Sequence, residues 1–262
     1  IATLVAAIAS LVALVVAFVP LERAFPARRG QPVLRPELAT DLAFFFGQYL
    51  AFTGASIALL LALRGALASR LPPLLGAAPL AARLVAAVVL GDLSVYAFHR
   101  ACHRFTWLWR FHAVHHSAEH LDWLAAHREH PVDGLLTQLA QNLPAFLLAV
   151  PPEALAGLAA FRGMWAVFVH SNVRVPLGPL RWVLGAPELH RFHHARRART
   201  EHNFANLAPW IDVVFGTHHL PDEDDAYELG LVEPLPKGYL RMLAAPLAPA
   251  AARSSPARAI RT

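Results

Sequence analysis

Long apolar runs dominate the first two thirds of the chain. They lie at about residues 2–19, 42–63, 80–98, 134–150 and 154–170 and contain few charged positions. A helix needs about 20 apolar residues to cross the hydrocarbon core of a bilayer, so these runs predict membrane-embedded helices. The last two runs are short and are separated only by Pro151-Pro152-Glu153. We expect them to form either two spans or one hairpin that enters the membrane.

Basic residues between the runs predict an orientation. The 20–41 connection carries four arginines and the 64–83 connection carries three, and many more follow His99. Because cytoplasmic loops carry the excess of Lys and Arg, we expect the 20–41 connection, the segments after His99 and the C-terminus to be cytoplasmic. No basic stretch precedes the first run, so it is expected to be a span and not a signal peptide. An integral protein of the bacterial inner membrane is the expected class.

The composition supports this class and excludes others. Of the 262 residues, 56% are hydrophobic and 16% are charged, whereas soluble domains contain about 25% charged residues. These values exclude a disordered chain and a nucleic-acid-binding domain. The single cysteine, Cys102, excludes an intrachain disulfide. The net charge of +5 comes almost entirely from arginines, which are interpreted as membrane-flanking residues.

Histidine is the polar residue that this apolar chain uses in excess. Thirteen of its 15 histidines lie between His99 and His202. Eight of them form three groups with the patterns HxxxH, HxxHH and HxxHH. These are His99 and His103, then His112, His115 and His116, and finally His190, His193 and His194. Residues three or four apart share a helix face, with Cβ atoms about 5–6 Å apart, so each group can present imidazoles to the same metal ions.

The number of histidines predicts two metals. Grouped imidazoles would be costly at a membrane boundary without a partner, which favours ligands over hydrogen-bonded core residues. A tetrahedral zinc takes four ligands, so eight imidazoles require two ions. An all-imidazole site does not distinguish iron, zinc, copper and nickel. The sequence contains no HExxH, the nearest string being His127-Arg-Glu-His130, and it contains no GxSxG, Walker or GxGxxG pattern.

Several longer motifs accompany the histidine groups. They are Asp92-Leu-Ser-Val-Tyr-Ala-Phe-His-Arg-Ala-Cys-His103, Leu108-Trp-Arg-Phe-His-Ala-Val-His-His-Ser117, Arg128-Glu-His130-Pro131, His170-Ser-Asn172, Trp210-Ile-Asp212 and Phe215-Gly-Thr217. Over about residues 85–220 the chain therefore resembles the fatty acid hydroxylase/sterol desaturase superfamily, which comprises integral-membrane di-iron oxygenases. His202 and the His218-His219 pair depart from the usual pattern of that superfamily.

The runs, the histidine groups and the resemblance together predict an all-α integral-membrane bundle. It has four to five hydrophobic helices or hairpin arms, and a cytosolic helical cap holds a dinuclear metal site. Residues 1–232 are expected to form one membrane-embedded catalytic domain, with the cap at 99–133 and 171–220. The Pro-, Ala- and Arg-rich residues 233–262 are expected to be a surface tail.

The resemblance also implies roles for further residues. His170, at the inner end of the fifth run, is a ninth expected ligand, and His130 is a further candidate. Asp92 is an acid inside an apolar run, two turns before His99, and we expect it to orient a ligand histidine, together with Tyr96. Asn172 and Asp212 are expected to act in the same way. The other histidines are His120, His127, His202, His218 and His219, and they have weaker claims as ligands.

The resemblance implies two iron ions as cofactors, O2 as co-substrate and a hydrophobic, lipid-like substrate drawn from the membrane. Zinc can occupy such a site in overexpressed protein. Electrons are expected from an external donor, such as a cytochrome b5-like protein, a ferredoxin or a reductase. The predicted reaction is hydroxylation of an unactivated C–H bond, and desaturation on the same scaffold is the alternative. The histidines alone also permit a zinc-dependent membrane hydrolase, or a bis-histidine haem protein, which adjacent histidines at helix ends fit poorly.

Overall fold

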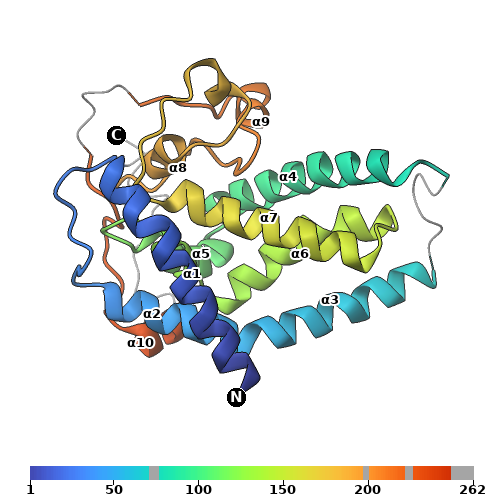
Figure 1. The fold of residues 1–262 in the computed structure, drawn as a ribbon, viewed down its shortest axis with the longest axis horizontal. Coiled ribbons are helices and arrows are strands. Elements are labelled where there is room, and N and C mark those ends of the chain that lie inside the picture. The colour runs from blue at the N-terminus through green and yellow to red at the C-terminus, as the bar shows by residue number, and fades with distance from the viewer. Residues whose placement is uncertain (71–76, 197–200, 222–226, 249–262) are drawn as a thin grey trace.

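Helices form the whole framework of the protein (Figure 1). The computed structural model describes residues 1–70, 77–196, 201–221 and 227–248. The helices are α1 (Ala2–Ala24), α2 (Leu38–Gly47), η1 (Gln48–Phe52), α3 (Thr53–Ala68), α4 (Leu80–Arg104), α5 (Thr106–His116), η2 (Ala125–His127), α6 (Pro131–Leu147), α7 (Pro152–His170), η3 (Gly178–Trp182), α8 (Pro187–His193), α9 (Trp210–Val214), α10 (Tyr239–Ala244) and η4 (Ala245–Leu247). Pairing of extended backbone among the described residues is limited to two isolated bridges, so the predicted all-α class is confirmed.

Three helical stretches are long and apolar enough to cross a membrane. They are Ala2–Ala24, Leu38–Ala68 and Leu80–Arg104, and they carry the first three predicted runs. The second stretch joins α2 to α3 through the π-helical turn η1, where the helix changes direction in Figure 1. Large apolar side chains on all three stretches are exposed, as expected for surfaces that face lipid.

The fourth and fifth apolar runs form the helical hairpin α6–α7. Neither helix of this hairpin is among the three candidate membrane spans. The chain reverses at Ala149, whose φ of 50° lies in the left-handed region. α6 packs along both α4 and α3. Figure 1 shows α3, α4, α6 and α7 extending from a common end, where α5 and α8 gather.

α4 is longer than the apolar run that predicts it. The run ends at about residue 98, but the helix continues to Arg104 and stops where Phe105 adopts extended backbone. His99 and His103 therefore lie on the last turns of a candidate membrane span. α5 begins directly afterwards, so the first two histidine groups are joined by a single sharp turn.

The expected surface tail begins with a packed segment. In α10 the ring of Tyr239 lies edge-on to Phe44 of α2, with the ring centroids 4.9 Å apart. Met242 is buried against Phe44 and Val114 of α5. Residues 233–262 are thus not a uniform tail, because apolar side chains of α10 are buried on the bundle. Residues 249–262 lie outside the described part of the chain.

Candidate metal centre

Nine imidazoles meet where α4, α5, α7 and α8 end, and they form two groups. The first group contains His99, His103, His112, His116 and His193, and the second contains His115, His170, His190 and His194. Within each group, one ring nitrogen of every residue lies within 4.8 Å of the others. These nine are the histidines that the sequence analysis predicts as ligands.

The ring nitrogens converge at the spacing of metal ligands. The Nε2–Nε2 distances are 3.0 Å for His115–His170, 2.9 Å for His170–His190, 3.1 Å for His190–His194, 3.1 Å for His112–His116 and 3.2 Å for His116–His193. Nitrogens bound about 2.0–2.1 Å from one metal lie roughly 3.0–3.4 Å from each other at tetrahedral or octahedral angles. Each group can therefore surround one ion.

The two groups are neighbours because each HxxHH motif contributes to both. On α5, His112 and His116 point into the first group and His115 into the second. At α8, His193 joins the first group, whereas His190 and His194 join the second. The rings of His116 and His194 stack across the boundary with their centroids 4.3 Å apart. Adjacent histidines on a helix diverge, so an HH pair can serve two adjacent ions.

Backbone carbonyls and one carboxylate hold the other side of five rings. The Nδ1–H groups donate from His99 to the Phe204 carbonyl (2.8 Å), from His115 to the Arg128 carbonyl (3.2 Å), from His170 to the Ala166 carbonyl (2.6 Å), from His193 to the His202 carbonyl (2.7 Å), and from His112 to Asp133 Oδ2 (2.8 Å). Such partners are typical of metal-bound histidines, because they select the tautomer with a free Nε2 lone pair. The free lone pairs point to the centre of each group.

Burial supplies a test of whether the residues fit a metal. The Nε2 atoms of His99 and His103 are buried and lack a hydrogen-bond partner in the part of the chain that the structure describes. A buried polar atom without a partner is costly, and a metal ion at the centre of the first group would satisfy both. The donor set and its geometry therefore fit two metal ions.

The protonation state of the rings also suits metal binding. Burial lowers the pKa of His115, His116, His190 and His194 well below the ordinary value for imidazole, and it lowers the pKa of His193 to about 3. Nearby histidines lower these values further, because positive charges on adjacent rings would repel. These five rings are therefore neutral at pH 7, as ligands must be.

Asp133 is a site residue that the sequence analysis missed. It lies in the first turn of α6, is buried, and accepts the Nδ1–H of His112. The Cys102 thiol lies 3.8 Å from its other oxygen. An acid at the edge of an apolar run is the same signal that marks Asp92, and it could have identified Asp133 as well.

A buried network of ion pairs fixes the segment around Arg128, whose backbone carbonyl accepts the hydrogen bond from His115. The guanidinium of Arg128 is fully buried and pairs with Asp41 of α2 and with Glu37. Asp41 also pairs with Arg35, 2.6 Å away. This network fixes the backbone at Arg128, because both of its charged partners belong to the start of a candidate span.

The part of the chain that builds this site matches a known family. The model of the fatty acid hydroxylase family covers residues 84–217, about half of the chain. The chain belongs to the fatty acid hydroxylase family. The resemblance stated from the sequence motifs is thereby confirmed.

Curated relatives are hydroxylases, monooxygenases and sterol desaturases. The ornithine lipid hydroxylase OlsE of Rhizobium tropici is 33% identical over 64% of this chain and 51% of its own length. The human alkylglycerol monooxygenase is 32% identical over 55% of this chain and 32% of its own length. A putative Delta(7)-sterol-C5(6)-desaturase of Arabidopsis thaliana is 25% identical over 54% and 50%. The chain thus spans about half or less of these relatives. No solved structure matches this chain.

In this fatty acid hydroxylase family member, the four residues expected to orient histidines act less directly. Asp212 accepts from the backbone N–H groups of Phe204 and Ala205, at 2.8 and 2.9 Å, and so places the Phe204 carbonyl beside His99. Asp92 accepts from the N–H groups of Leu207 and Ala208. Both carboxylates therefore shape the 204–208 loop, and neither is hydrogen-bonded to one of the nine rings among the described residues.

Tyr96 and Asn172 are also structural neighbours of the site. The Tyr96 hydroxyl lies 2.9 Å from Thr217 Oγ1, which links α4 to the segment after α9. The Asn172 side chain exchanges two hydrogen bonds with the backbone of Arg28, and Asn172 lies two residues after His170 in the sequence. Asn172 therefore ties the end of α7 to the connection that follows α1.

His130 does not join either group. Its Nδ1 accepts from the Val132 N–H at the start of α6, and its Nε2–H donates to the Leu243 carbonyl. His120 lies 3.4 Å from Glu37, and the ring of His218 stacks on Trp182. The remaining histidines, His127, His202 and His219, also lie outside the two groups.

Proposed function

We propose that this chain is an O2-dependent di-iron membrane oxygenase that hydroxylates an unactivated C–H bond of a lipid or another hydrophobic molecule. The observation that carries the proposal is the pair of adjacent imidazole groups, with five and four members. Nine imidazoles in two neighbouring groups suit two iron ions, because imidazole is a good ligand for iron.

The protein's own residues hold and shield this site. Two iron ions, when bound, supply the activation of O2 that the cleavage of a C–H bond requires. The carbonyl and carboxylate partners of the Nδ1–H groups fix the ring orientations, and Asp133 makes His112 a stronger donor to the metal. His193 and His194 are fully buried, so water is kept from the inner face of both groups.

A membrane-dissolved substrate agrees with the rest of the molecule. The relatives are named for ornithine lipid, alkylglycerol and sterol substrates. The candidate span α4 carries His99 and His103 on its last turns, so a hydrophobic molecule can approach the site from the lipid phase. We infer a location in the bacterial inner membrane with the metal site on the cytoplasmic side. There an external cytochrome b5-like protein, ferredoxin or reductase supplies electrons.

Desaturation is the alternative reaction, and the sterol desaturase relatives favour it. A hydroxylase and a desaturase both begin by removing hydrogen from a C–H bond, so the same histidine site serves either outcome. A zinc-dependent hydrolase on the same ligands is the third possibility, in which the metal would activate water.

Lipid analysis under labelled oxygen tests the proposal. Membranes with and without the expressed chain are incubated under 18O2, and their lipids are compared by mass spectrometry. A product with one 18O atom is expected. Loss of two hydrogens without label would mean desaturation, and a product labelled only in a parallel incubation with H218O would mean hydrolysis, so either outcome would overturn hydroxylation.

Metal analysis of the purified chain tests the site itself. The two imidazole groups predict about two metal ions per chain, and a value below about 1.5 would contradict a dinuclear site. His193→Ala should lose both metal and product. His120→Ala is the matched control, because His120 lies outside both groups and should keep both properties.

A further inference from the structure

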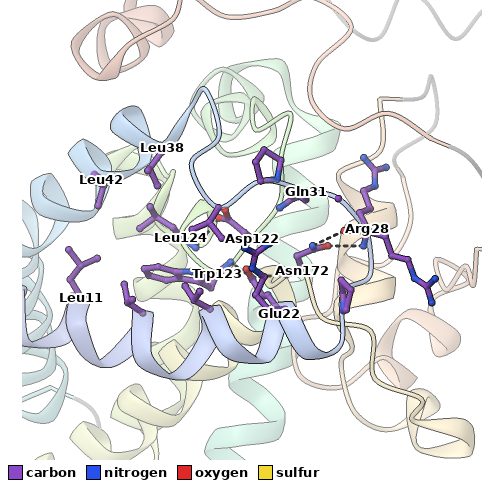
Figure 2. Close-up of a pocket in the computed structure, with 18 residues that line it drawn as sticks. Leu11, Glu22, Arg28, Gln31, Leu38, Leu42, Asp122, Trp123, Leu124 and Asn172 are labelled. Atoms are coloured by element: carbon purple, nitrogen blue, oxygen red, sulfur yellow. Dashed lines mark hydrogen bonds between the residues drawn. The ribbon is translucent and has the colours of Figure 1, made fainter.

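A cavity of about 370 Å³ lies apart from the metal centre (Figure 2). It is open on one side and is lined by α1, α2, the connection between them and the 122–124 segment, and Trp123 forms part of its wall. None of the nine grouped histidines lines it. Cavities of about 300–1,000 Å³ are typical of binding sites for small molecules.

The cavity has an apolar end formed by two helices. Leu11, Val15 and Val19 recur every four residues on α1, and Leu38 and Leu42 do the same on α2. This spacing places each set on one helix face. Figure 2 shows Leu11, Leu38 and Leu42 together on one side of the cavity, and Arg28 on the other.

The opposite end, which we call the mouth of the cavity, is polar and lies where α1 ends. Arg23 is in the last turn of α1, and Arg28 and Arg29 follow in the connection to α2. Because α1 is a candidate membrane span that ends at Ala24, we infer that this end lies at the membrane boundary and that the part along Leu11 and Val15 lies deeper in the bilayer. The cavity therefore has the polarity and direction of a membrane lipid.

The acidic groups at the cavity already have partners. Glu22 accepts from the N–H groups of Trp123 and Asn172, at 2.9 and 2.8 Å. Asp122 pairs with the buried Arg35. Both carboxylates line the cavity, and both already have hydrogen-bond or ion-pair partners within the protein.

The arginines at the mouth keep their charge available. The Arg28 guanidinium donates to the Tyr227 carbonyl and lies over the ring of that residue, so these two partners are neutral. Arg23 and Arg29 are exposed, and the ion pairs found among the described residues involve other arginines. The mouth thus presents positive charge next to an apolar cavity.

We propose that this cavity binds one phospholipid with an anionic headgroup. The phosphate lies between Arg23 and Arg29, and an acyl chain runs along Val15 and Leu42 toward the middle of the bilayer. Arginine binds phosphate through paired N–H donors, and the apolar walls exclude water from the chain. This site is distinct from the metal centre, and its test needs neither metal nor turnover.

Native mass spectrometry of the full chain in detergent tests the proposal. The probes are phosphatidylglycerol, which is anionic, and phosphatidylcholine, which is zwitterionic. We expect one phosphatidylglycerol per chain, bound more tightly than phosphatidylcholine. Each basic residue near an anionic lipid surface contributes about fivefold to binding, so R23Q/R29Q should weaken phosphatidylglycerol binding by about 25-fold.

Matched variants separate this site from general charge and general lipid contact. R70Q/K237Q removes two exposed positive charges elsewhere and should bind like the wild type. Val15→Trp fills the cavity and should weaken both lipids, whereas Val16→Trp, on an exposed neighbouring position, should weaken neither. Thermal unfolding verifies that each variant is folded.

Three outcomes would overturn the proposal. The first is equal phosphatidylglycerol binding by R23Q/R29Q and R70Q/K237Q. The second is equal lipid binding by the Val15 and Val16 variants. The third is full displacement of the lipid by inorganic phosphate at millimolar concentration, which would show that the acyl chain contributes nothing and that the arginines recognise a free anion.

Discussion

The Nδ1 atom of His112 lies 2.8 Å from Oδ2 of Asp133, and both side chains are buried. The two residues belong to different helices, α5 and α6, so this hydrogen bond ties a member of the first imidazole group to the hairpin α6–α7. A carboxylate in this position orients the ring and raises its basicity. Asp133 therefore positions His112 without itself contacting the predicted metal.

Removing this carboxylate should weaken metal binding. We expect Asp133→Ala to lower metal affinity by about 10–100-fold, the range typical of partners of metal-bound histidines. The measurement is the metal content of the purified protein after dialysis against graded chelator. Glu153→Gln, at an exposed acid at the start of α7, is the control and should leave affinity unchanged. Equal retention by the two variants would exclude a role for Asp133.

His115 and His130 should respond differently to substitution. His115→Ala removes a member of the second group and should reduce metal content by about one ion per chain. His130→Ala removes the cap at the start of α6, which should cost about 1 kcal/mol of stability. It should retain the metal. Metal analysis and thermal unfolding distinguish the two effects, and metal loss in His130→Ala would make His130 a ligand.

Acid should destabilise the fold and release metal together. The ordinary pKa of histidine is about 6.5, whereas burial lowers that of His193 to about 3 and those of His116 and His194 well below the ordinary value. Between about pH 6.5 and 3 the unfolded chain binds protons that the folded chain does not. Stability should therefore fall as the pH falls through this window. Above about pH 7.5 these histidines should make no pH-dependent contribution to stability.

This pH dependence can be followed by metal content and by the unfolding midpoint between about pH 8 and 4. Metal-bound imidazoles must be neutral, so the two quantities should decline over the same range. A midpoint that rises as the pH falls below about 6 would contradict the assignment of neutral, buried rings.

Arg128 should be far more important for stability than an exposed arginine. Its guanidinium is fully buried between Asp41 and Glu37, and its removal leaves buried carboxylates with fewer partners. We expect Arg128→Ala to cost about 3–5 kcal/mol. Arg196→Ala, which breaks partly exposed pairs with Glu119 and Glu228, should cost about 0–1 kcal/mol. Denaturant unfolding in detergent measures both, and similar losses would mean that the buried network is not a stabilising unit.

Local patterns along the chain are sufficient to predict the helices and which histidines can gather into metal-binding groups. An apolar run predicts a helix by length and composition, and a spacing of three or four residues predicts a shared face, since both depend only on helix geometry. For this reason the eight histidines of the three spaced motifs lie in the two groups, together with His170, which the family resemblance implies. The boundaries are less predictable, because α4 continues beyond its apolar run to Arg104 and so includes His99 and His103.

How the histidines are divided between the two groups, and what holds their rings, depends on the packing of the helices. The division of each HxxHH motif between two groups follows from the arrangement of α4, α5, α7 and α8, which no single helix specifies. The acceptors for His99 and His112 lie 105 and 21 residues away along the chain. Backbone carbonyls leave no mark in a sequence. An acid such as Asp133 stands out beside an apolar run, but the ring that it contacts is known only from the fold. Residue types and local spacing thus specify which side chains can bind metal, whereas contacts between distant segments set the geometry in which those side chains meet.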